Sequence, residues 1–302
     1  MGASLCDAIL KMAWIQITFH VRAEHASAVA DVLSDLNALA VTLVDAEDNP
    51  VYEPDPGAVD LWQRTKVIGL FDDDRDIKPI IRHIETRFPQ QLLDHNIENI
   101  ADENWVSKSL DQFQPLRCGD RLWIVPTWHT PPDPHAVNVM LNPGLAFGTG
   151  NHATTALCLE WLDANPPAGQ TVLDFGCGSG ILAIAALKLG AERVLVVDHD
   201  PQAIEATLAN AAENQLQDRI AIVSADDIQE ASIDTLLANI LAGPIISLAP
   251  RFMPWLKVGS PAILSGILSE QGNQVTQTYQ PWFTITNVVE RDNWLRIDTR
   301  RK

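Results

Sequence analysis

Residues 152–281 alternate between short apolar segments and segments with helical spacing, and this alternation limits the possible folds more than any other feature. The apolar segments are nearly continuous, as in strands that are buried on both faces. A parallel sheet covered by helices on both sides buries such strands. The expected strands are 171–174, 193–198, 220–224, 235–240 and 261–265, and the expected helices are 154–165, 179–189, 201–214, 244–256 and 270–278.

The C-terminal residues depart from this alternation. Two segments rich in β-forming residues, 282–290 and 293–299, are separated only by a tight turn. A turn this short joins antiparallel neighbours, so the last strand must run against the others. The sequence therefore predicts a doubly wound, Rossmann-like α/β sheet of seven strands with an antiparallel last strand.

The first 100 residues have a different order of elements, which is strand, helix, strand, strand, helix, strand. Strands are expected at 14–21, 40–44 and 66–71, and helices at 24–36 and 76–88. This order is that of a small split βαβ, ferredoxin-like α+β domain. Residues 45–60 contain three prolines and a glycine between the two halves of this domain and predict an exposed loop.

These patterns divide the chain into four regions. Residues 1–11 are expected to be a disordered N-terminal extension, and residues 12–100 form the small domain. Residues 101–150 form a connecting segment, and residues 151–302 form the large sheet. The connecting segment predicts a short helix around 102–113 and strands near 121–125 and 137–141. Its "HTPPDPH" segment, 129–135, cannot be helical because each proline restricts itself and the preceding residue.

The charge of the chain is strongly acidic, with 39 Asp and Glu against 21 Lys and Arg and a formal net charge of -18. This charge repels phosphate backbones and fits a basic macromolecular partner better than nucleic acid, although solubility alone would also explain it. No apolar run reaches the roughly 18 residues of a membrane span, and no secretory signal is recognisable. The four cysteines form no CxxC pair, so we expect free thiols, no metal site and a cytoplasmic protein without membrane contact.

A glycine-rich segment, "VLDFGCGSG" at 172–180, follows the first expected strand of the large sheet. Ligands of doubly wound sheets bind at this end of the strands, and Gly176, Gly178 and Gly180 allow the backbone to approach a ligand closely. The spacing differs from the G-x-G-x-x-G of dinucleotide enzymes. Asp174 stands two residues before the first glycine and suits a cofactor that carries an ammonium group. The pattern favours S-adenosyl-L-methionine, with a nicotinamide-dependent oxidoreductase as the rival interpretation.

Two further polar residues end later strands. Asp198 follows the next strand, about twenty residues after the glycines, where an acid can accept both ribose hydroxyls. Asp200 could compete for this role, but Asp200-Pro201 is typical of a helix N-cap with proline at the first position. Asn239 could accept a hydrogen bond from an amine and orient the lone pair of the amine nitrogen. Alternatively, it could only form a hydrogen bond within a turn. His152 is interpreted as a capping or packing residue rather than a general base.

The chain from Met12 to Lys302 resembles the ribosomal protein L11 methyltransferases. The resemblance rests on "WIQI" from Trp14, "VIGLFD" from Val67, "AVNVMLNPGLAFGTGNHATT" from Ala136, "DFGCGSGILAIAALKLGA" from Asp174, "DPQAI" from Asp200, "ANILAGP" from Ala238 and "LSGIL" from Leu264. It implies a substrate-recognition domain at the N-terminus, a connecting segment and a class I methyltransferase domain. The cofactor positions of the family correspond to Thr155, Gly176, Asp198 and Asn239.

The resemblance implies an S-adenosylmethionine-dependent protein methyltransferase. It would modify α-amino and lysine ε-amino groups of ribosomal protein L11, and we expect a monomer. Its cofactor-binding residues would be Thr155, Asp174, Gly176, Gly178, Gly180, Asp198 and Asn239, and Asn239 would also be the catalytic residue. The alternatives are a methyltransferase for another basic protein or a small molecule, and a non-catalytic ribosome-assembly binder.

The sequence departs from the family pattern at three places. Ala153 stands where the family usually has proline, which should loosen that loop. Ser109 replaces a second tryptophan of the connecting segment, which makes the docking of the two domains harder to infer. Residues 1–11 have no counterpart, so Met12 is a second candidate for the first residue.

Overall fold

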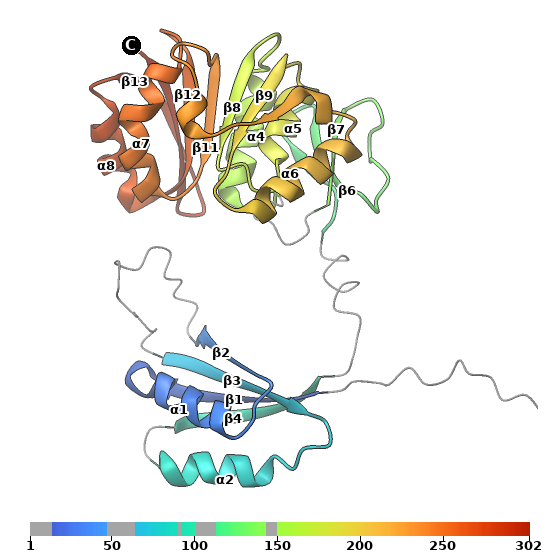
Figure 1. Cartoon of the computed structure of the whole chain (residues 1–302), viewed down its shortest axis with the longest axis vertical. Helices are drawn as coiled ribbons and strands as arrows, with labels where there is room; N and C mark the ends of the chain where they lie inside the picture. The colour runs from blue at the N-terminus through green and yellow to red at the C-terminus, as the bar shows by residue number, and fades with distance from the viewer. Residues whose placement is uncertain (1–13, 47–63, 90–91, 101–112, 143–149) are drawn as a thin grey trace, which may run out of the picture. The chain divides into compact units, whose positions relative to one another are not determined.

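The computed structural model describes residues 14–46, 64–89, 92–100, 113–142 and 150–302, and the chain divides into two compact units, 1–111 and 112–302 (Figure 1). The predicted extension at 1–11, the helix expected around 102–113 and the loop expected at 45–60, from residue 47 on, lie outside the described residues. The strands predicted within 101–150 belong to the second unit. The domain boundaries at residues 100 and 150 remain predictions.

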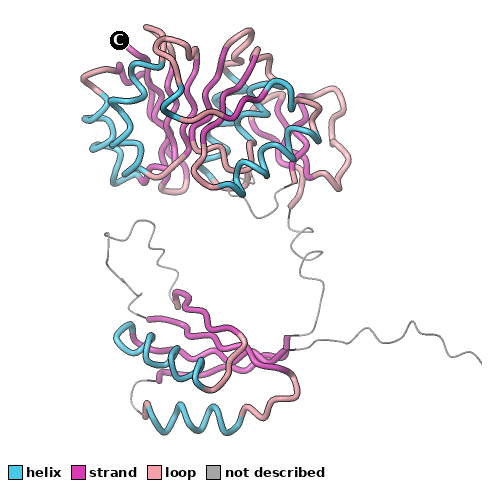
Figure 2. The backbone as a smooth tube through the Cα atoms, viewed as in Figure 1, coloured by secondary structure: helices cyan, strands magenta, loops and turns pink. Residues whose placement is uncertain are grey.

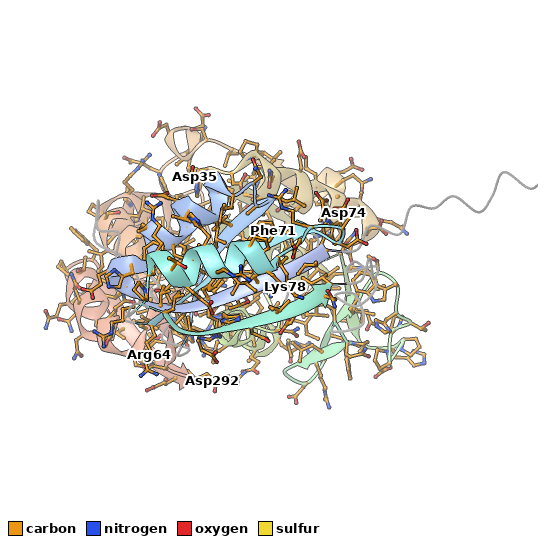
Figure 3. The ribbon with its side chains drawn as sticks, turned by 90° about the horizontal axis from the view of Figure 1, so that it is seen from below. Asp35, Arg64, Phe71, Asp74, Lys78 and Asp292 are labelled. Atoms are coloured by element: carbon orange, nitrogen blue, oxygen red, sulfur yellow. The ribbon has the colours of Figure 1, made fainter. Side chains whose placement is uncertain are left out.

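The first unit is a four-stranded antiparallel sheet in the order β2-β3-β1-β4 with two helices, which is the expected ferredoxin-like arrangement. Its buried side chains come from alternate residues of the strands and from the apolar stripes of both helices, and form one cluster. Phe71 belongs to this cluster, and Figure 3 shows it near α2, which lies across the sheet in that view. The elements are β1 (Trp14–Arg22), α1 (Ala23–Asp35), β2 (Ala40–Asp45), β3 (Arg64–Asp72), α2 (Lys78–Arg87) and β4 (Leu92–Ile100).

The second unit contains a seven-stranded sheet in the order β10-β9-β8-β11-β12-β14-β13. Strand β14 runs antiparallel to both of its neighbours, as predicted for the last strand, whereas the pairs from β10 to β12 are parallel. Its strands are β8 (Thr171–Phe175), β9 (Arg193–Val197), β10 (Ile220–Ile222), β11 (Thr235–Asn239), β12 (Pro261–Leu268), β13 (Phe283–Arg291) and β14 (Trp294–Arg301).

Helices cover both faces of this sheet (Figure 2). One hydrophobic cluster joins the strands to α4 and α5, and a second joins them to α7 and α8. Val172 belongs to the first cluster and its neighbour Leu173 to the second, which explains why β8 is an unbroken apolar run. The helices are α4 (Ala153–Ala164), α5 (Ile181–Lys188), α6 (Pro201–Glu213), α7 (Ala242–Trp255) and α8 (Gly272–Tyr279), with short 3-10 turns at Gln217–Arg219, Ala225–Asp227 and Ser269–Gln271.

A third, three-stranded sheet lies in the same unit, in the order β5-β6-β7. Strands β6 (Leu122–Pro126) and β7 (Val137–Leu141) lie where the sequence predicted them, and the "HTPPDPH" segment between them contains no helix. Strand β5 (Leu116–Cys118) was not predicted, because three residues are too few to show a period.

No helix in the described ranges is long and apolar enough to cross a membrane. Cys118, Cys158 and Cys177 are buried free thiols, as predicted for the cysteines. Within the same residues, no group of three His, Cys, Asp or Glu side chains lies close enough to hold a metal ion.

Candidate active site

The glycine turn between β8 and α5 is the centre of the site. Gly176, Gly178 and Gly180 all have left-handed backbone conformations, with φ of 80°, 54° and 78°. A Cβ on Gly176 would overlap the side chain of Ile240, and a Cβ on Gly180 would lie 2.9 Å from Thr207 Cγ2. Backbone strain therefore disfavours a side chain at all three positions, and close packing also opposes one at Gly176 and Gly180.

Asp198 joins the end of β9 to this turn. Its Oδ2 accepts a hydrogen bond from the Gly178 N–H at 3.0 Å, and its Oδ1 accepts one from the Asp200 N–H at 3.0 Å. The side chain is only 9% exposed. Asp200 accepts from the Gln202 N–H at 2.9 Å and caps α6, with Pro201 at the first position, which confirms the predicted N-cap. The two acids that competed in the sequence thus have separate structural roles.

Asp174 lies beneath the turn, with only 1% of its surface exposed. Its Oδ2 accepts a hydrogen bond from the Ala183 N–H at 3.0 Å, so the carboxylate holds the first turn of α5. Burial raises the pKa of Asp174 from 3.8 to about 7, the Ala183 hydrogen bond opposes this shift, and the charge of Asp198 adds to it. The contact between Asp174 and a cofactor ammonium remains a prediction.

Asn239 and Thr155 meet at the end of β11, although 84 residues separate them in the chain. Asn239 Nδ2 donates to Thr155 Oγ1 at 3.1 Å, and Thr155 lies fully buried in the first turn of α4. Within the described residues, the amide oxygen of Asn239 receives no hydrogen bond. This oxygen is therefore available as an acceptor for a ligand. Only the family resemblance indicated Thr155, because a lone threonine in a helix carries no signal of its own.

His152 caps α4. Its Nδ1 lies 2.8 Å from Thr154 Oγ1, and its ring packs edge-on against Trp294 with centroids 5.0 Å apart. Burial lowers the pKa of His152, which favours the neutral ring. These contacts confirm the interpretation of His152 as a capping and packing residue.

Two residues of α6 that the sequence analysis did not single out also contact the glycine turn. Thr207 Oγ1 donates to the Gly178 carbonyl at 3.0 Å, and Asn210 Nδ2 donates to the Ser179 carbonyl at 2.9 Å. The available signal was their spacing, because polar residues three apart share a face of this alanine-rich helix.

The structure thus brings the glycine turn, Asp198 and Asn239 to the ends of β8, β9 and β11, which are neighbours in the sheet. A doubly wound sheet with an antiparallel β14 between β12 and β13, and an acid after β9, defines a class I methyltransferase-like α/β protein. The family model described as Ribosomal protein L11 methyltransferase (PrmA) matches residues 13–302. The chain belongs to this family and is a methyltransferase.

Related sequences match nearly the whole chain, and a related solved structure matches about two thirds of it. The ribosomal protein L11 methyltransferase of Pseudomonas paraeruginosa is 49% identical over 292 residues, which cover 96% of this chain and 99% of that protein. The ribosomal protein L11 methyltransferase of Azotobacter vinelandii is 47% identical, covering 96% of this chain and 100% of that one. The crystal structure of a ribosomal protein L11 methylase from Lactobacillus delbrueckii subsp. bulgaricus has a TM-score of 0.58 and 34% identity, covering 63% of this chain and 100% of that chain.

Proposed function

We propose that this chain transfers methyl groups from S-adenosyl-L-methionine to α-amino and lysine ε-amino groups of ribosomal protein L11. The observation that carries this proposal is the meeting of the glycine turn, Asp198 and the Asn239–Thr155 pair at one edge of the sheet. Family membership over residues 13–302 supports the same conclusion.

The residues at this edge fit the proposed cofactor. The turn carries little side-chain bulk, because Gly176, Gly178 and Gly180 have no side chains, so its backbone can approach a ligand closely. The Asp198 carboxylate has about four acceptor positions. Two of them bond backbone N–H groups, and His199 Nδ1 lies 3.5 Å from Oδ1, so acceptor capacity remains for a ribose hydroxyl. We expect Asp174 to supply negative charge for the ammonium group from beneath the turn. When bound, the cofactor supplies an electrophilic methyl group on a sulfonium, which is a good leaving group.

The task of the protein is therefore to align an amine and exclude water. Asn239 Oδ1 would accept a hydrogen bond from the amine and direct its lone pair at the methyl carbon. The new N–C bond would form as the C–S bond breaks, and the electron pair of the C–S bond would pass to the sulfur. Before this step the amine must lose its proton, which at pH 7 costs roughly 4–5 kcal/mol for lysine and about 1 kcal/mol for an α-amino group. We expect burial to lower the lysine pKa, without a dedicated base.

The acidic charge of the chain suits a basic protein substrate. A net charge of -18 attracts basic protein surfaces and repels nucleic acid. We propose that the protein acts as a monomer in the cytoplasm, without direct contact with nucleic acid or membrane.

The proposal is tested by incubating the full chain with isotopically labelled S-adenosyl-L-methionine and unmodified ribosomal protein L11, followed by mass spectrometry of the L11 peptides. We expect label on the α-amino group and on lysines. Cofactor binding without transfer to L11 would indicate another basic protein or a small molecule as substrate. Binding to L11 without cofactor and without transfer would indicate an assembly factor. An absorbance change with NADH, and no heat with S-adenosyl-L-methionine, would indicate an oxidoreductase.

A further inference from the structure

Helix α6 and its C-cap residue present a row of three buried polar side chains, Thr207, Asn210 and the C-cap Asn214. Their spacing of three and four residues places them on one face of the helix. Buried polar groups are stable only when they are hydrogen-bonded. The partners of this row lie on β7 and on the glycine turn.

The two asparagines bond the open edge of β7 and the residue that follows it, whereas the other edge of β7 pairs with β6. Asn214 accepts from the Met140 N–H at 3.0 Å and donates to the Met140 carbonyl at 2.6 Å. Asn210 accepts from the Asn142 N–H at 2.8 Å and donates to the Asn142 carbonyl at 3.2 Å. Each amide therefore pairs with both polar backbone groups of one residue, as a neighbouring strand would.

The N-terminal part of the row bonds the glycine turn. Asn210 Nδ2 also donates to the Ser179 carbonyl. Thr207 Oγ1 lies 3.0 Å from the Gly178 carbonyl and 3.3 Å from Cys177 Sγ, so its hydroxyl donates to acceptors within the turn. The N–H of Gly178 is bonded by Asp198, so both backbone polar groups of Gly178 are held by side chains. Asn214 makes no hydrogen bond to the turn.

We infer that Thr207 and Asn210 are positioning residues for the cofactor, and that they act through the carbonyls of Gly178 and Ser179. This inference rests on the proposed use of S-adenosyl-L-methionine. Because left-handed glycines have little conformational restraint of their own, the turn needs external hydrogen bonds to keep its shape. Without these bonds, part of the binding energy is spent on ordering the turn, so affinity for the cofactor falls while turnover at saturation changes little.

The structure supplies a matched pair for the test, Asn210→Ala and Asn214→Ala, measured in the full chain by calorimetric titration with S-adenosyl-L-methionine and by thermal unfolding. Asn214→Ala loses two hydrogen bonds to Met140 of β7 and one to the Asn210 carbonyl. Asn210→Ala loses two to Asn142 and one to the turn, so only Asn210→Ala loses a bond to the turn. We expect the cofactor Kd to rise about tenfold in Asn210→Ala and less than about twofold in Asn214→Ala. Both should lose a similar amount in Tm, and the kcat of Asn210→Ala should remain near that of the wild type.

A second pair covers the case in which Asn210→Ala does not fold. Thr207→Val keeps the shape of the buried side chain and loses the hydroxyl, and we expect its Kd to rise about threefold to tenfold. Thr207→Ser keeps the hydroxyl and should bind the cofactor like the wild type.

Four results would overturn these assignments in distinguishable ways. Wild-type affinity in Asn210→Ala, or in Thr207→Val, would show that the turn does not depend on that residue. Equal losses of affinity in Asn210→Ala and Asn214→Ala would show a general effect of stability. A wild-type chain without affinity for S-adenosyl-L-methionine would overturn the cofactor assignment and this inference together. A wild-type chain that binds the cofactor but does not methylate L11 would overturn only the proposed substrate.

Discussion

Three aspartates surround the glycine turn, and each makes different contacts. Asp174 is buried beneath the turn and bonds the backbone of α5, Asp198 bonds the turn itself, and Asp200 caps α6. The sequence identified Asp200 correctly as the N-cap of α6, because proline after an acid marks a helix start. The sequence did not reveal the burial of Asp174, because the burial of a residue at a strand end depends on helices from other parts of the chain that pack against it.

Substitution of Asp198 should weaken cofactor binding. We expect Asp198→Ala to raise the Kd for S-adenosyl-L-methionine at least about tenfold, because it removes the ribose acceptor and the bond to Gly178. Asp200→Ala is the matched control. It should lose about 1 kcal/mol of stability as a lost N-cap and keep the affinity of the wild type. Calorimetric titration and urea unfolding of both variants measure these effects, and a larger loss of affinity in Asp200→Ala would reverse the assignment.

Asn239 is expected to act in the chemical step. In Asn239→Ala, turnover at saturating cofactor should fall about 100-fold, because the amine loses its orienting acceptor. Thr155→Val removes the hydroxyl that holds the Asn239 amide and should produce a smaller fall in the same direction. Steady-state rates with L11 measure both effects. Unchanged turnover in Asn239→Ala would remove this residue from the chemistry.

Asp174 should make the stability of the protein depend on pH. The pKa of Asp174 is about 7 in the folded state, above the ordinary aspartate pKa of 3.8, so the folded state binds more protons between pH 4 and pH 7. The contribution of this group to the free energy of unfolding therefore falls as pH rises through that window, by up to about 4 kcal/mol. Asp174→Asn keeps an acceptor for Ala183 and removes this dependence. Urea unfolding at pH 5 and pH 8 should show that the free energy of unfolding of the variant, relative to that of the wild type, is higher at pH 8 than at pH 5. A difference between the two proteins that does not change with pH would contradict the prediction.

At the scale of the element, the sequence located the main strands and helices, and the differences lie at their ends. Helix α5 begins at Ile181, two residues later than expected, because Gly180 has a left-handed conformation. Strand β12 continues to Leu268, beyond the expected end at residue 265. Its register against β14 shifts between Ser265 and Ile267, and a shift of this kind depends on the partner strand.

A buried ion pair lies within β14, and its arginine also bonds α4. Arg296 donates to both carboxylate oxygens of Asp298, at 2.7 and 3.1 Å, and to the Leu157 carbonyl at 2.7 Å. We expect Asp298→Ala to lose about 3–5 kcal/mol of stability, because it leaves a buried charge unpaired. The double variant Arg296→Met, Asp298→Leu should have a free energy of unfolding close to that of the wild type.

The exposed pair Arg251–Asp226 is the control for this prediction. Asp226→Ala should change the free energy of unfolding by less than about 1 kcal/mol. Chemical denaturation measures all three variants, and equal losses in Asp226→Ala and Asp298→Ala would contradict the argument from burial.

At the scale of the whole molecule, the two units follow different rules of construction. The first unit is an antiparallel sheet whose strands alternate between buried and exposed residues, and the second has strands buried on both faces. This difference is visible in the sequence, so both fold classes could be predicted. The sequence did not predict that β5, β6 and β7 belong to the second unit, because this depends on pairing between segments that have no shared pattern.

The net charge of -18 should accelerate encounter with a basic substrate. We expect the association rate with ribosomal protein L11 to fall about tenfold or more as salt rises from low to physiological concentration, while the dissociation rate changes less. Stopped-flow measurements at several salt concentrations test this expectation. An association rate independent of salt would show that the acidic surface serves solubility alone.

The sequence by itself determined the class of each unit, the glycine turn, Asp198 at its strand end and the capping role of Asp200, because these depend on periodicity and local backbone chemistry. Only the tertiary structure decided which distant side chains meet. The pairing of Asn239 with Thr155, the burial of Asp174 and the contacts of Thr207 and Asn210 with the turn all join segments that lie far apart in the chain. Such contacts are fixed by the packing of helices on the sheet, and no local pattern records them.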